Sequence, residues 1–178
     1  MLISLKKALE KAQKNHYAVP AFNINNLEFL QAIIKAAELE KSPVILQTSE
    51  GAISYAGMEN LVMLVKNAAK KTKIPVVLHL DHGRDQNILK KAIKNKYSSV
   101  MIDASHEPFE KNIKITKEIV KSAHKKGISV EAELGTIGGA EDNIKSRKIL
   151  FTDPEAAKIF VKKTGIDALA VAIGTSHG

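Results

Sequence analysis

The sequence predicts an α/β fold, and within that class a (β/α)8 barrel that is truncated after its sixth strand. Strand-like apolar runs and amphipathic helical patterns alternate along the whole chain with short links. The apolar runs lack polar alternation, which is typical of a parallel sheet covered on both faces. Polar residues follow the ends of these strands, and in a barrel the carboxyl ends of all strands meet at one mouth.

A doubly wound parallel sheet is the alternative architecture for the same alternation. It would not bring six consecutive strand ends to one small site. A dinucleotide-binding version would also place a GxGxxG motif after the first strand, and the sequence has none there. The position of the polar residues therefore favours the barrel.

The first half of the chain contains three strands, each preceded by a helical pattern. Asn25 and Glu28 resemble a capping box, which begins a helix carrying Leu27 and Ala37 on its apolar stripe. Pro43 and Pro75 each precede an apolar run. The predicted elements in order are helix 2–14, strand 18–22, the helix that follows the capping box, strand 44–48, helix 58–71 and strand 76–80.

The second half repeats the pattern. Asp85 is a candidate cap for the next helix, and Gly127 lies where a helix stop is expected. Asp153 and Pro154 fit an N-cap and first-turn pair, and Gly165 ends that helix. The predicted elements are a helix carrying Ile88 and Ile93, strand 98–102, helix 109–126, strand 128–133, helix 154–165 and strand 167–173.

The connection after the fifth strand differs from the other links. Residues 134–152 show no strong periodicity and exceed the usual length of a connection. Gly135, Gly138 and Gly139 permit mobility, and Glu141 and Asp142 follow them. We interpret this segment as a flap over the active site, with a variable surface insertion as the alternative.

Composition and charge limit the classes of function. The 178 residues suffice for one domain, which we place at 1–178, and 44% of them are hydrophobic. The net charge is +8, but the cations are mostly lysines and only 4% of residues are aromatic, so we expect no nucleic-acid partner. With no cysteine, signal peptide pattern or membrane-length apolar run, we expect a cytoplasmic protein without a membrane partner. The charge is typical of a lysine-rich solvated surface, and attraction of a phosphorylated substrate is the alternative.

Two histidines at strand ends indicate a metal site. His82 and His177 each offer a ring nitrogen to a borderline metal ion such as zinc, and a catalytic zinc site takes three protein ligands. Glu133 is a candidate for the third ligand, as is a residue beyond Gly178 in a longer chain. The alternative for each histidine is a hydrogen-bonded structural role. Asp81 either transfers a proton near the metal or orients a histidine.

Several segments together carry a resemblance to a known family. They are HLDHG (79–83), SVMIDASH (99–106), VEAELG (130–135) and AIGTSHG (172–178), with VPAFNINN (19–26) and QTSEGA (47–52) in support. In this order and spacing the chain resembles the class II, metal-dependent fructose-1,6-bisphosphate aldolases over residues 1–178. The resemblance implies a (β/α)8 barrel, a homodimer or homotetramer, and reversible cleavage of fructose 1,6-bisphosphate into dihydroxyacetone phosphate and glyceraldehyde 3-phosphate.

The resemblance also implies roles for individual residues. His82 and His177 match zinc ligands, and Asp103 and Glu133 match acids of a second or alternative metal position. Asp81 matches the acid that handles the aldehyde oxygen, and Glu141 matches the carboxylate that exchanges a proton with the dihydroxyacetone carbon. Asn23 and Ser49 match substrate-pocket residues, and Gly178 matches backbone that holds phosphate and a monovalent cation.

One alternative is excluded and two remain open at the level of the sequence. A lysine Schiff base would catalyse the same cleavage without metal, but none of the six predicted strands ends in lysine, so this route lacks its nucleophile. Tagatose-1,6-bisphosphate aldolases share the motifs. The resemblance further implies two more strands, a third histidine ligand and phosphate-binding segments outside the 178 residues, so the chain is alternatively a metal-binding part that is catalytically incompetent alone.

Overall fold

The computed structural model describes residues 1–136, 138–141, 144–146, 150–174 and 176–177, with the side chains of residues 1–136 and 150–174. Its centre is a six-stranded, all-parallel sheet in the order β1-β2-β3-β4-β5-β8. The strands are β1 (Ala21–Asn23), β2 (Val44–Thr48), β3 (Val76–Gly83), β4 (Ser99–Ile102), β5 (Ser129–Leu134) and β8 (Ala168–Val171).

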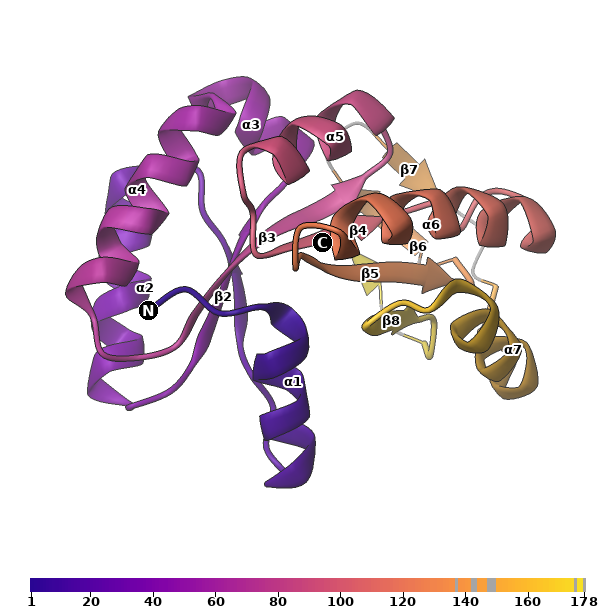
Figure 1. Cartoon of the computed structure of the whole chain (residues 1–178), viewed down its shortest axis with the longest axis horizontal. Helices are drawn as coiled ribbons and strands as arrows, with labels where there is room; N and C mark the ends of the chain where they lie inside the picture. Colours follow the sequence, from indigo (N-terminus) through magenta and orange to yellow (C-terminus); the bar gives the residue numbers. More distant parts are fainter. Residues whose placement is uncertain (137, 142–143, 147–149, 175, 178) are drawn as a thin grey trace.

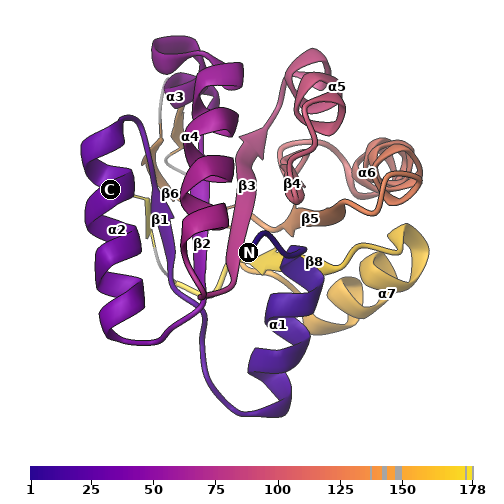
Figure 2. The ribbon, with the colours of Figure 1, turned by 60° about the vertical axis from the view of Figure 1, so that its left-hand side comes forward.

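The sheet curves into a half-barrel, and the helices between its strands lie along its outer side (Figure 1, Figure 2). This arrangement confirms the predicted truncated barrel. The helices are α1 (Leu5–Lys14), α2 (Leu27–Leu39), α3 (Glu50–Ala56), α4 (Met58–Lys71), α5 (Gln86–Lys94), α6 (Phe109–His124) and α7 (Pro154–Thr164).

The two faces of the strands carry different side chains, because successive residues of a strand point to opposite faces. Val76, Leu78 and Leu80 of β3 belong to the large apolar core that the outer helices cover. The residues between them, Val77 and His79, therefore point toward the barrel interior. On the other strands the same alternation directs inward the apolar Ile45 and Met101 and the polar Gln47, Ser99, Glu131 and Glu133. Asp103 follows directly after β4.

Helix α1 closes the interior at the amino end of the strands. Its Leu5 and Ala8 pack against Ile45 of β2 and Val77 of β3 in a second, smaller apolar cluster. The apolar plug at this end leaves the polar inward residues nearer the carboxyl end of the strands. This position is the one that sequence reasoning assigned to a functional mouth.

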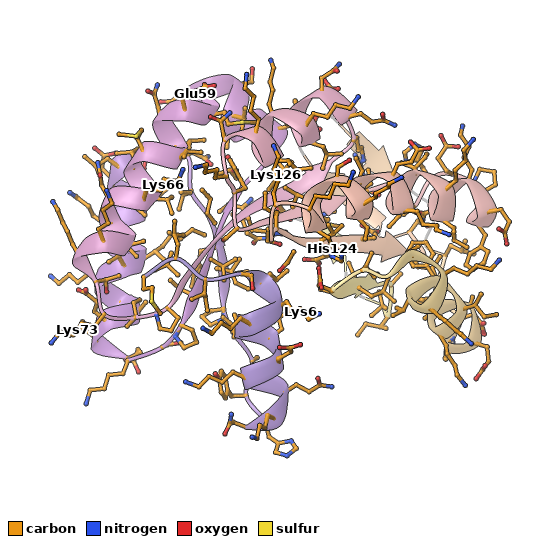
Figure 3. All side chains as sticks on the ribbon, in the orientation of Figure 1. Lys6, Glu59, Lys66, Lys73, His124 and Lys126 are labelled. Atoms are coloured by element: carbon orange, nitrogen blue, oxygen red, sulfur yellow. The ribbon has the colours of Figure 1, made fainter. Side chains whose placement is uncertain are left out.

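An ion-pair cluster links α1 to the rest of the sheet at its amino end. The Asp167 carboxylate lies 3.4 Å from Lys6 Nζ and 2.8 Å from His124 Nε2, and it accepts a 2.9 Å hydrogen bond from the Val130 N–H. Lys6 of α1 and His124 at the end of α6 are labelled in Figure 3 as the two basic residues of this cluster. These bonds hold the pKa of Asp167 below its usual value against the opposing effect of burial.

Most predicted elements are confirmed, with shifts at their ends. Strand β1 begins at Ala21 rather than at residue 18, because Pro20 has no N–H to donate to a ladder. Helix α2 is capped by Asn26 and not by Asn25, since the Asn26 side chain accepts from the Phe29 N–H at 2.9 Å. Helix α6 ends at His124, before Gly127 with its φ of +69°.

Two segments contain structure that the sequence patterns did not predict. Helix α3 follows β2 directly, with the Ser49 hydroxyl as its N-cap acceptor. The predicted flap contains β6 (Gly138–Glu141) paired antiparallel with β7 (Ile144–Ser146), and β9 (Ser176–His177) adds to β6 in parallel. The interpretation of this segment as a mobile flap stays a prediction.

The sheet is open at both ends. Among the described strands, none pairs with the outer edge of β1 or of β8. Large apolar side chains at these ends are exposed, including Phe22 (47%) on β1 and Phe151 (65%) before α7. None of the helices in the described part of the chain combines the length and the apolar content needed to cross a bilayer.

Candidate metal centre

Three residues from neighbouring strands bring metal-binding atoms together at the carboxyl end of the sheet. One ligand atom each from His82, Asp103 and Glu133 lies within 4.8 Å of the other two. His82 Nδ1 is 3.4 Å from Asp103 Oδ2 and 3.9 Å from Glu133 Oε2. An imidazole nitrogen with two carboxylate oxygens is a donor set that suits zinc, so the residues present fit such an ion.

The local backbone explains how His82 reaches this cluster. Strand β3 carries one extra residue relative to β4, because Leu80 pairs with Val100 whereas Gly83 pairs with Ile102. This is a β-bulge, a feature common next to functional sites. Within it, His82 has a φ of +101°, which is rare for a residue with a Cβ atom.

Asp81 is adjacent to the cluster and is held in place. Its Oδ1 lies 3.8 Å from His82 Nε2 and accepts a 3.0 Å hydrogen bond from Gln47 Nε2 of β2. The Asp81 side chain is 12% exposed. A carboxylate in this position, held by an amide and partly exposed beside the candidate ligands, has the chemistry of a general acid or base.

Asp103 accepts hydrogen bonds on both of its carboxylate oxygens. Arg84 Nε donates to its Oδ2 at 2.7 Å, and Ser105 donates to its Oδ1 from the hydroxyl at 2.7 Å and from the N–H at 3.1 Å. Burial alone would raise the pKa of Asp103, but the bonds from His82 and Ser105 and the charge of Arg84 outweigh burial. The pKa of Asp103 is therefore far below its usual value.

Below the cluster, the barrel interior holds a second histidine and a second glutamate. His79 is buried, with Nδ1 2.9 Å from the Ser99 hydroxyl and Nε2 3.5 Å from Glu131 Oε2. Burial, with a smaller effect of His82, lowers the pKa of His79 to about 3. Burial and the charge of Asp81 raise the pKa of Glu131 to about 7.

The remaining predicted site residues divide into three groups. Asn23 ends β1 and is exposed, and Ser49 caps α3 at the end of β2. Only the backbone of His177 and Glu141 is described. His177 of β9 pairs with Gly139 of β6, and Glu141 lies two residues after Gly139 on the same strand. Gly178 lies outside the described residues.

Sequence reasoning missed four residues that contact the candidate site: Gln47, Arg84, Ser105 and Glu131. Glu131 had a detectable signal, because it precedes Glu133 by two residues and a strand repeats every two. Ser105 also follows Asp103 by two residues, the spacing of an Asx turn. No pattern distinguished Arg84 from a surface residue, and Gln47 lay inside the predicted strand 44–48 without a signal of its contact with Asp81.

The fold and this site define the chain as part of a β/α-barrel protein with a cluster of metal-binding side chains at the carboxyl edge of its strands. The family model for class-II fructose-bisphosphate aldolase matches residues 3–178. The chain belongs to the class-II fructose-bisphosphate aldolase family, whose members are zinc-dependent and act on phosphorylated sugars. The resemblance found in the sequence is thereby confirmed.

Individual relatives agree with the family. The chain is 53% identical to a fructose-bisphosphate aldolase of Giardia intestinalis and 51% identical to one of Geobacillus stearothermophilus, in each case over 99% of this chain. It spans 55% and 63% of the lengths of those two proteins.

Solved structures show the same fold. The YdjI aldolase of Escherichia coli K12 superposes with a TM-score of 0.89 at 40% identity, over 99% of this chain and 64% of that one. A fructose-bisphosphate aldolase of Campylobacter jejuni superposes with a TM-score of 0.84 at 28% identity, over 99% of this chain and 60% of that one.

Proposed function

We propose that this chain carries the metal centre and the acid–base residues of a zinc-dependent fructose-1,6-bisphosphate aldolase. The observation that carries the proposal is the convergence of His82, Asp103 and Glu133 within 4.8 Å beside Asp81, in a chain of the class-II family. His82 and His177 would hold the catalytic ion, with Asp103 and Glu133 at an alternative position. Such an ion polarises a carbonyl oxygen and stabilises negative charge next to it.

The chain's own residues then account for the proton movements. In the cleavage direction, Asp81 accepts the proton of the hydroxyl that becomes the aldehyde oxygen of glyceraldehyde 3-phosphate. The carbon–carbon bond breaks, and its electron pair stays on the dihydroxyacetone side. Glu141 supplies the proton that this carbon needs. Gln47 orients Asp81 through its 3.0 Å hydrogen bond, so the base is in position before the substrate binds.

Asn23 and Ser49, at the ends of β1 and β2, are proposed to contact the substrate, and Gly178 to hold phosphate and a monovalent cation. We further propose a homo-oligomer and a cytoplasmic location, as the resemblance and the composition suggest. The relatives named above are fructose-bisphosphate aldolases, which favours fructose over tagatose 1,6-bisphosphate as the substrate.

A coupled assay tests the proposal directly. The chain, supplied with Zn²⁺ and fructose 1,6-bisphosphate, is expected to release triose phosphates, and a chelator is expected to stop the release. Asp81→Asn should retain Zn²⁺ and lose about 10²–10⁴-fold in kcat. Release that resists the chelator, or faster cleavage of tagatose 1,6-bisphosphate, would contradict the assignment.

The open sheet favours a second candidate function. Six paired strands leave the outer edges of β1 and β8 without a described partner, and a barrel requires closure. On this view the chain binds the ion but needs a complementary polypeptide for turnover. Stoichiometric Zn²⁺ binding together with no triose phosphate release would support this second candidate over the first.

A further inference from the structure

Arg84 brings a permanent positive charge into the candidate metal centre. It follows the bulge of β3, and its Nε and Nη2 lie 2.7 and 2.5 Å from Asp103 Oδ2. The Asp103 side chain is 0% exposed and that of Arg84 is 31% exposed. The guanidinium therefore reaches from the rim of the mouth onto a fully buried carboxylate.

Both oxygens of Asp103 already carry donors. Oδ2 faces two guanidinium nitrogens of Arg84, which are donors only. Oδ1 accepts from the hydroxyl and the N–H of Ser105. A carboxylate offers about four lone-pair positions, so these donors use the positions through which Asp103 would ligate a metal ion.

The loop that carries Arg84 is fixed independently of the metal centre. Glu50 Oε1 accepts hydrogen bonds from the N–H groups of Arg84 and Asp85, each at 2.9 Å. Glu50 is the first residue of α3, so this contact ties the end of β3 to the end of β2. Arg84 is thus held at two points: its backbone N–H binds Glu50, and its guanidinium binds Asp103.

We propose that Arg84 takes the place of a second cation at Asp103, so that the centre of this chain binds one divalent ion rather than two. The inference rests on the metal centre proposed above and specifies its stoichiometry. An arginine does not lose its proton in proteins, and its charge repels a second divalent ion from the alternative position between Asp103 and Glu133. Asp103 then acts as a positioning residue, because its buried Oδ2 orients His82.

Metal stoichiometry tests this inference without any assay of turnover. The 178-residue chain is equilibrated by dialysis against graded Zn²⁺, and bound zinc is measured by mass spectrometry. We expect one ion per chain in the wild type and in Arg84→Lys, which keeps the charge, and two in Arg84→Ala. Arg84→Gln, which keeps most of the side chain but loses the charge, should also bind two ions. It replaces Arg84→Ala in the experiment if the alanine variant does not fold. Lys91→Ala, a matched loss of one exposed cation on α5, should bind one.

The double variant Arg84→Ala/Asp103→Asn should return to one ion, because the second ion needs the freed carboxylate. One ion in Arg84→Ala and Arg84→Gln, two ions in the wild type, or a second ion that persists in the double variant would each overturn the inference. One ion in both Arg84→Ala and Arg84→Gln would overturn the inference but leave the proposed metal centre intact. Absence of bound Zn²⁺ in all the proteins would instead refute the proposed metal centre, and the inference with it.

Discussion

His82 combines a strained backbone with a central place in the candidate site. Its φ of +101° is a conformation in which a Cβ atom crowds the backbone. Backbone strain of this kind persists only where the surrounding structure imposes it, and strained residues are common at functional sites. Here the bulge imposes it, and the result is an imidazole within 4 Å of three carboxylates.

Two substitutions at His82 separate metal binding from strain. His82→Ala and His82→Gly should both lose the bound Zn²⁺. The glycine variant should be more stable than the alanine variant by about 1 kcal/mol, because glycine adopts positive φ without a steric cost. Metal analysis and urea unfolding of the metal-free proteins measure the two effects. His106→Ala, at an exposed loop histidine, is the control, and full metal occupancy in either His82 variant would contradict ligation.

The burial of His79 should add a pH-dependent contribution to the stability of the metal-free chain. Its pKa is about 3 in the fold and 6.5 in the unfolded chain, so the unfolded state binds more protons between these values. His79 alone therefore lowers the free energy of unfolding by about 2 kcal/mol as the pH falls from 6.5 to about 5. The effect of His79 is absent above the unfolded value. Glu131, whose pKa is raised to about 7, acts in the opposite direction over the same window.

Urea unfolding in the presence of a chelator, at pH 7 and about pH 5, measures the effect of His79. From pH 7 to about pH 5, the free energy of unfolding of His79→Gln should rise by about 2 kcal/mol relative to that of the wild type, whereas the exposed His106→Gln should follow the wild type. The same pH dependence in His79→Gln and in the wild type would show that His79 makes no such contribution.

Residue types at strand ends were predictable, but their bonds were not. The sequence placed Asp81, His82, Asp103 and Glu133 at ends of parallel strands, and such ends meet at one edge. That Arg84 binds Asp103 depends on the bulge, which sets the direction of the chain after Gly83. No local pattern specifies that direction, because a bulge is defined against the partner strand.

At the scale of elements, the contact between α3 and the end of β3 is a structural tie that the sequence did not reveal. Helix α3 spans only seven residues and contains Gly51, so it lacks the periodic stripe that identifies a helix. The longer helices and the β2 strand were predicted to the residue or nearly so, because their apolar spacing and their flanking prolines are strong signals. Pairing between β6 and β7 was missed because a glycine-rich segment shows little strand character.

Removal of the Glu50 carboxylate should loosen this tie. Glu50→Ala leaves the N–H groups of Arg84 and Asp85 without their acceptor, and the expected loss is about 1–3 kcal/mol in the free energy of unfolding. Urea unfolding measures it. Glu59→Ala removes an exposed carboxylate from the first turn of α4 and should change stability by less than about 0.5 kcal/mol. Equal effects of the two variants would show that the Glu50 contact is unimportant.

At the scale of the whole molecule, the open half-barrel determines how the chain behaves in solution. The barrel class was predictable from the order of strands and helices, since parallel strands with right-handed helical connections form few architectures. The open edges follow from the count of strands, because six strands do not close an eight-stranded barrel. What the sequence could not supply is which apolar side chains remain uncovered at those edges, because exposure depends on packing across the sheet.

The exposed apolar side chains at the two edges should bind an apolar fluorescent dye. Phe22→Gln and Phe151→Gln, at opposite ends of the sheet, should each lower the dye fluorescence of the chain. Met63→Gln, a change at an exposed position on the outer helix α4, should lower it less. Dye binding that is insensitive to both edge variants would show that the edges are covered, for instance by a second copy of the chain.

The extra residue in β3 has a consequence for how the gene can change. Consecutive residues of a regular strand face opposite ways, yet Asp81 and His82 approach to 3.8 Å. A single-codon deletion within 79–83 would restore the ordinary pleat and turn one of the two away from the other. Insertions in the surface turns leave this pairing untouched, so we expect length variation to be tolerated there and eliminated from β3.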